Sequence, residues 1–126
     1  MVAPWQVRPN APAPGTFLMT WEELTAPADN PVRLLSFGKG RMAFSMILLV
    51  TAAGPRAYVN LCPHYTMPLD AGTGLFLSAD GDIQCRQHFA LFAPADGRCF
   101  AGACPGASLD AIPLQVDGRG NIHIAD

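Results

Sequence analysis

Proline and glycine interrupt this chain at short intervals along its whole length. There are 12 prolines and 12 glycines among 126 residues. Because both residues favour turns and weaken helices, the segments between them are too short for long helices. This pattern is typical of an all-β domain built from short strands.

Six short segments have the composition of β-strands. They are residues 17–21, 32–37, 43–50, 56–61, 112–116 and 121–124. The second to fourth are expected to form a meander that runs directly into Cys62, and the last two a closing hairpin. Thr20 and Glu23 have the spacing of a capping box, so one helical turn should follow the first strand. The sequence therefore predicts an antiparallel β-sandwich or barrel scaffold that flanks an irregular insertion at about residues 62–106.

Length, charge and hydropathy exclude several classes of function. The chain suits a single domain over residues 15–126, preceded by a flexible, proline- and alanine-rich arm at residues 1–14. A net charge of -2 without any run of lysine or arginine argues against nucleic acid as a partner. The longest apolar stretch, residues 42–50, is far shorter than the roughly 20 residues of a membrane span. The N-terminus lacks the pattern of a signal peptide, so we expect a cytoplasmic protein.

Four cysteines in a cytoplasmic chain favour metal binding or redox chemistry over a disulfide framework. They form two unlike pairs. Cys62 and Cys85 are each followed by a histidine, in Cys62-Pro63-His64 and Cys85-Arg86-Gln87-His88, with 20 residues between the two motifs. Each motif offers one thiolate and one imidazole. A Rieske [2Fe–2S] cluster needs that supply, since two cysteines bind one iron and two histidines the other.

The competing interpretation of the same four residues is a zinc site, because zinc also accepts two cysteines and two histidines. Zinc motifs usually pair like with like, as C-x-x-C and H-x-H, whereas here each motif holds one of each. This mixture favours the iron–sulfur cluster, with Cys62, His64, Cys85 and His88 as its ligands.

The chain resembles the Rieske [2Fe–2S] protein family over about residues 15–126. The motifs that carry the resemblance are Cys62-Pro63-His64, Leu69, Gly72, Cys85-x-x-His88, Ala90-Leu91-Phe92, Asp96-Gly97, Cys99…Cys104-Pro105 and Leu109. The resemblance implies antiparallel sheets with both ligand loops at one end and one Rieske-type cluster per chain. It also implies that a third loop, here residues 102–106, covers the cluster.

The resemblance bears on the reduction potential too. High-potential members carry serine and tyrosine hydroxyls two and four residues after the second histidine, where this chain has Ala90 and Phe92. They also carry an additional cysteine in each ligand loop, where this chain has Met67 and Gln87. Hydrogen bonds to the cluster sulfurs raise the potential, so their absence predicts a low-potential centre.

Two further groups of residues have competing interpretations. Cys99 and Cys104 are either small semi-buried side chains beside the covering loop or a pair with a disulfide or redox role. His123 alternates with Ile122 and Ile124, so its side chain should face solvent rather than a metal.

We compare three functions. The first is an electron-transfer ferredoxin that passes single electrons from a flavin-dependent reductase to an oxygenase or reductase, and is not a stand-alone catalyst. The second, a catalytic Rieske oxygenase, requires two more histidines for a mononuclear iron, and only His123 remains. The third is a non-redox binding or regulatory subunit, like small nitrite reductase subunits that keep the fold but can lose the ligands. The presence of all four ligands argues against it and leaves open a subunit of a larger reductase, such as nitrite reductase, that retains its cluster.

Overall fold

The structure is a computed structural model of the chain, and it describes residues 5, 10–25, 32–40, 43–51, 54–60, 82–84, 90–102 and 108–125. In these parts of the chain it contains one short helix, α1 (Trp21–Thr25), and strands that pair antiparallel. The strands are β1 (Phe17–Thr20), β2 (Val32–Phe37), β3 (Phe44–Thr51), β4 (Gly54–Val59), β5 (Ile83–Gln84), β6 (Leu91–Phe92), β7 (Cys99–Ala101), β8 (Ala111–Ile112), β9 (Leu114–Val116) and β10 (Asn121–Ile124). The predicted all-β class is confirmed.

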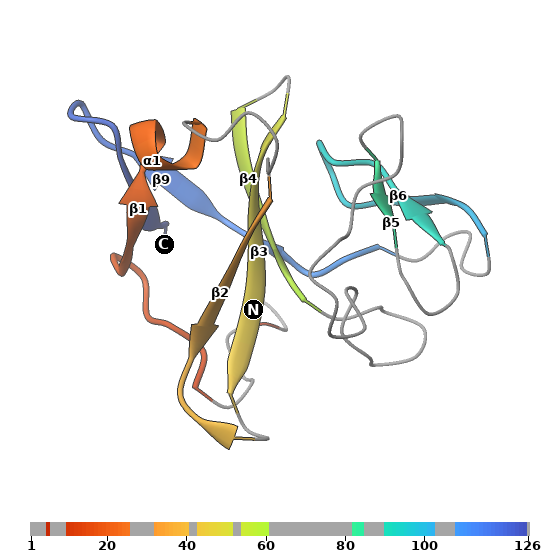
Figure 1. Cartoon of the computed structure of the whole chain (residues 1–126), viewed down its shortest axis with the longest axis horizontal. Helices are drawn as coiled ribbons and strands as arrows, with labels where there is room; N and C mark the ends of the chain where they lie inside the picture. Colours follow the sequence, from red (N-terminus) through yellow and green to blue (C-terminus); the bar gives the residue numbers. More distant parts are fainter. Residues whose placement is uncertain are drawn as a thin grey trace.

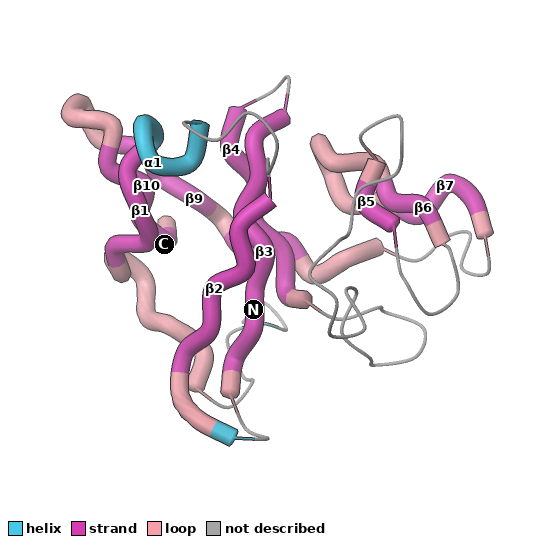
Figure 2. The backbone as a smooth tube through the Cα atoms, viewed as in Figure 1, coloured by secondary structure: helices cyan, strands magenta, loops and turns pink. Residues whose placement is uncertain are grey.

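The strands form three sheets. The outer sheet has the order β1-β10-β9, the central sheet β2-β3-β4-β8, and the small sheet β5-β6-β7. Figure 1 shows β2, β3 and β4 between β1 and β9 on one side and β5 and β6 on the other, and Figure 2 adds β10 and β7 to these two groups. In chain order the small sheet falls between β4 and β8. It is therefore inserted into the scaffold, as predicted.

Strand β3 is buried on both faces because each face of the central sheet is covered. Met46, Ile47, Leu48 and Leu49 are all at most 2% exposed. Met46 and Leu48 pack in the core toward the outer sheet, together with Ile122 and Ile124 of β10. Ile47 and Leu49 pack on the opposite face, in the core toward the small sheet. The other members of that core are Val32, Tyr58, Ile83, Ala90, Phe92, Cys99 and Leu109. A continuous apolar run, rather than an alternating one, is what such a doubly covered strand requires.

The predicted element bounds are close to the observed ones, with one informative difference. Residues 32–37 and 121–124 form strands at the predicted positions. The segment predicted as one strand over residues 112–116 is instead two, β8 and β9, separated at Pro113. Proline cannot donate a ladder hydrogen bond, so the chain leaves the central sheet there and continues in the outer sheet.

The predicted capping box begins α1. The Glu23 backbone N–H donates to Thr20 Oγ1 (3.0 Å), and the Thr20 N–H donates to Glu23 Oε1 (3.1 Å). This reciprocal pair satisfies two amides that would otherwise lack partners at the helix start. No described helix is long and apolar enough to cross a membrane.

Trp5 is the one described residue before Asn10, and it is not loosely held. Its side chain is 1% exposed and packs edge-on against Phe44 of β3, with 6.4 Å between the ring centroids. It belongs to the core between the central and outer sheets. The division into an arm at residues 1–14 and a domain at residues 15–126 stays a prediction, but at Trp5 the arm is anchored by an aromatic side chain.

Gly97 lies where the turn between β6 and β7 meets the central sheet. Its φ is +77°, a region that L side chains rarely adopt. A Cβ built there would lie 2.7 Å from Cε1 of Tyr58. The turn can thus press against the Tyr58 ring only because residue 97 has no side chain.

Gly97→Ala is expected to lower the free energy of unfolding by roughly 2–4 kcal/mol, from the strained φ and the clash together. Gly118→Ala is the matched control, because a Cβ at Gly118 meets no atom within 4 Å. It should change stability by less than about 0.5 kcal/mol. Urea unfolding of the two variants checks this, and equal effects would contradict the close contact.

Candidate metal centre

The four predicted ligands, Cys62, His64, Cys85 and His88, lie outside the described residues, as do Leu69 and Cys104. Among the residues that are described, no three His, Cys, Asp or Glu side chains gather as a metal site. The described strands do show how the chain enters and leaves both ligand motifs.

The chain reaches the first motif from β4, and its last described residue is tightly held. Asn60 follows β4 directly, two residues before Cys62, and is 4% exposed. Its backbone N–H donates to the Ser45 carbonyl (2.9 Å), and its Nδ2 donates to Ser45 Oγ (3.1 Å). Because β3 holds Asn60 at both backbone and side chain, the start of the first motif has a defined origin on the central sheet.

The second motif connects the two strands of a hairpin. Ile83 pairs with Phe92 and Gln84 with Leu91, so residues 85–90 join β5 to β6. Cys85 and His88 are both in this short connection. Ile83 and Phe92 are fully buried, and Ala90 is 1% exposed. Phe92 thus lies in the apolar core between the central and small sheets, which holds the two strands of the hairpin in place.

Cys99 is buried at the start of β7, 3% exposed, in the core between the central and small sheets. Its Sγ lies 3.4 Å from the Ala101 carbonyl, as a thiol donor would. This burial supports a packing role for Cys99. Whether Cys99 and Cys104 have a redox relation stays a prediction, since Cys104 is outside the described residues.

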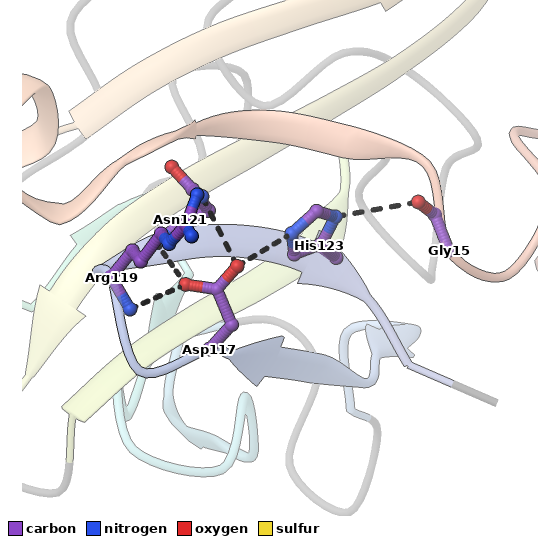
Figure 3. A network of polar contacts seen from close by, with 5 residues as sticks. All are labelled: Gly15, Asp117, Arg119, Asn121 and His123. Atoms are coloured by element: carbon purple, nitrogen blue, oxygen red, sulfur yellow. Dashed lines mark hydrogen bonds and ion pairs between the residues drawn. The ribbon is translucent and has the colours of Figure 1, made fainter.

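His123 faces outward, as predicted from its alternation with Ile122 and Ile124. The two isoleucines are at most 1% exposed, whereas the His123 side chain is 30% exposed. Figure 3 shows His123 between Asp117 and Gly15. Its Nε2 is 3.4 Å from Asp117 Oδ2 and its Nδ1 is 3.4 Å from the Gly15 carbonyl. His123 thus belongs to a surface network of the outer sheet and not to a metal site.

Asp117 is the centre of that network. Its Oδ1 accepts hydrogen bonds from the backbone amides of Arg119 (2.8 Å) and Asn121 (3.0 Å), and its Oδ2 accepts one from Asn121 Nδ2 (3.1 Å). These donors, with the Asn121 amide first, lower the pKa of Asp117 to about 2. The Asp117 carboxylate therefore stabilises the β9–β10 turn. This structural role accounts for a charged residue at this position, so no bound ligand is needed to explain it.

Sequence analysis missed the polar contacts between the central and small sheets. The Tyr58 hydroxyl donates to the Pro94 carbonyl (2.6 Å), and Arg56 Nε donates to the next carbonyl, that of Ala95 (2.9 Å). Burial raises the pKa of Tyr58 to about 12, with a lowering effect from Arg56 and a raising one from Asp96. The one available signal was the pair Arg56 and Tyr58, two hydrogen-bond donors at alternate positions of the strand just before the first motif.

A surface cavity of about 300 Å³ borders these contacts. Its lining comes from β4, from the turn after β6, and from the segment around β8, and includes Arg56, Tyr58, Asp96, Ile112 and Leu114. The two sheets are therefore not closely packed along their whole boundary.

Comparison with protein families gives one match. The family model described as the Rieske [2Fe–2S] domain matches residues 22–114, which is most of the chain. A comparison with curated protein sequences found no match.

Solved structures share the fold. The ferredoxin of carbazole 1,9a-dioxygenase from Nocardioides aromaticivorans IC177 aligns with a TM-score of 0.60 and 22% identity, covering 87% of this chain and 97% of that one. One chain of the complex of reduced oxygenase and oxidized ferredoxin in carbazole 1,9a-dioxygenase aligns at 0.61 and 18%, covering 88% and 94%. A quaternary ammonium Rieske monooxygenase aligns at 0.64 and 19%, covering 95% of this chain but 34% of that one. At these identities the likeness concerns the fold alone.

Proposed function

This chain belongs to the Rieske [2Fe–2S] domain family and so carries one Rieske-type cluster, and from that premise we propose that it transfers single electrons as a low-potential ferredoxin. The observation that supports this most directly is the β5–β6 hairpin, because its strands are anchored in a buried core and Cys85 and His88 fall in the sequence between them.

The proposed ligands are Cys62, His64, Cys85 and His88. The donor set fits the cluster because it contains two thiolates and two imidazoles. The described strands fit as well, since β4 delivers the first pair and the β5–β6 hairpin the second. When bound, such a cluster takes up and releases one electron at a time. The task of the chain is then to hold the four donors and keep bulk water from the buried side, where Ile83 and Phe92 are fully buried.

We propose a flavin-dependent reductase as the electron donor and an oxygenase as the acceptor. The complex of an oxygenase with a ferredoxin among the structural neighbours supports the acceptor. We place this exchange in the cytoplasm, with residues 15–126 as the functional domain.

Purified protein is expected to hold two irons and two acid-labile sulfides per chain, as this cluster type requires. Cys85→Ser should abolish both, because a hydroxyl is a poor ligand for these irons. Cys99→Ala is the matched control, since Cys99 lies in the core and is not a proposed ligand. It should keep the full iron and sulfide content. One zinc per chain in place of iron, or loss of the cluster in Cys99→Ala alone, would contradict the assignment.

The midpoint potential is expected in the lower half of the range of about -150 to +300 mV known for Rieske centres. Ala90 and Phe92 lack hydroxyls and are buried. Ala90→Ser should therefore raise the potential by adding a hydrogen-bond donor near the sulfurs. Ala90→Gly controls for the change in packing and should leave the potential near the wild-type value. Redox titration followed by visible absorption measures all three proteins, and a wild-type potential well above zero would refute the proposal.

A further inference from the structure

Two side chains of β4 donate hydrogen bonds to consecutive carbonyls of the small sheet. Tyr58 donates to Pro94 and Arg56 to Ala95, at 2.6 and 2.9 Å. The donors are two residues apart on β4, so their side chains leave the strand on the same face and reach the same turn. The turn that accepts both hydrogen bonds, residues 93–97, is closed by its own hydrogen bond from the Gly97 N–H to the Ala93 carbonyl (2.7 Å). The contact is thus made to a rigid turn.

The two elements that these hydrogen bonds join each flank one of the ligand motifs in the chain. β4 is the strand that leads into the first ligand motif, with Cys62 three residues after Val59. The turn at residues 93–97 joins β6 to β7, and β6 is the strand that follows the second motif, with Leu91 three residues after His88. Tyr58 therefore links the strand before one ligand pair directly to the hairpin after the other.

The contact between Tyr58 and this turn is buried and closely packed. Tyr58 is 1% exposed, and its ring contacts the turn so closely that Gly97 has no room for a Cβ. A tyrosine hydroxyl is protonated at neutral pH, and burial, which raises the pKa of Tyr58 to about 12, keeps it a donor in mildly alkaline solution as well. The polar contacts therefore add a directional link to the apolar core that Tyr58 shares with Ile83 and Phe92.

We propose that Tyr58, assisted by Arg56, is a positioning residue for the cluster, because it sets the separation of the two ligand pairs. This inference rests on the proposed function, since it requires that Cys62, His64, Cys85 and His88 bind one cluster. A bridged pair of irons has fixed dimensions, so four donors on two separate elements bind it well only if those elements are held at one distance. The Tyr58 hydroxyl helps to fix that distance although Tyr58 belongs to neither ligand motif.

The test is Tyr58→Phe, which removes one oxygen and keeps the ring against Gly97. The variant should still fold and bind a cluster. It should release iron to a chelator about tenfold faster, the effect expected from one lost buried hydrogen bond. Its reduced electron paramagnetic resonance spectrum should show broader lines at the wild-type average g, because the ligand geometry is less uniform. Arg56→Lys, which removes the Nε donor at a half-buried site, should act in the same direction and more weakly.

The matched control is Ile122→Val in the core toward the outer sheet. It also lowers the unfolding temperature by loss of packing, but it should leave the release rate and line widths unchanged. If Ile122→Val and Tyr58→Phe speed release equally, or if Tyr58→Phe matches the wild type in release and line width, the positioning role is wrong. A wild-type protein without any iron–sulfur cluster would instead overturn the proposed function.

Discussion

The proposed site depends on how the central and small sheets are held together. The two proposed ligand pairs are carried by different sheets: the first follows β4 of the central sheet, and the second connects β5 and β6 of the small sheet. On this proposal, neither sheet supplies all four ligands. The shared core around Ile47, Tyr58 and Phe92 and the hydrogen bond from Tyr58 to Pro94 maintain the relative position of the sheets. The outer sheet, on the far face of the central sheet, completes the burial of β3 and so stabilises the base on which this arrangement rests.

This division also explains why the chain can be small and still hold a demanding cofactor. The scaffold supplies stability through β3, whose residues 46–49 are buried on both faces. The small sheet then needs only two- and three-residue strands, because its core side chains pack on the central sheet and not on one another alone. Proteins with this fold range from ferredoxins of similar length to oxygenases in which it covers about a third of the chain. The same fold therefore occurs both in chains of this length and as part of longer chains.

Local patterns in the sequence predicted what is local in the fold. Alternation and turn residues located β2 and β10, and the spacing of Thr20 and Glu23 located the start of α1. The switch of sheets at Pro113 and the anchoring of Trp5 depend on tertiary packing and were not predicted. The contact between Tyr58 and Pro94 joins residues 36 positions apart, and nothing in either neighbourhood specifies the other. The four ligands stay a prediction from two local motifs, whereas the contacts that link the elements flanking those motifs depend on tertiary structure and could not be predicted from either motif.

The proposed binding of one [2Fe–2S] cluster by two cysteines and two histidines can be tested by an electron paramagnetic resonance spectrum of the dithionite-reduced protein at low temperature. Histidine ligation of the reduced iron lowers the average g below that of clusters with four cysteines, so we expect a rhombic signal with that low average. A signal with the average g of an all-cysteine cluster, or a silent and colourless protein, would contradict it.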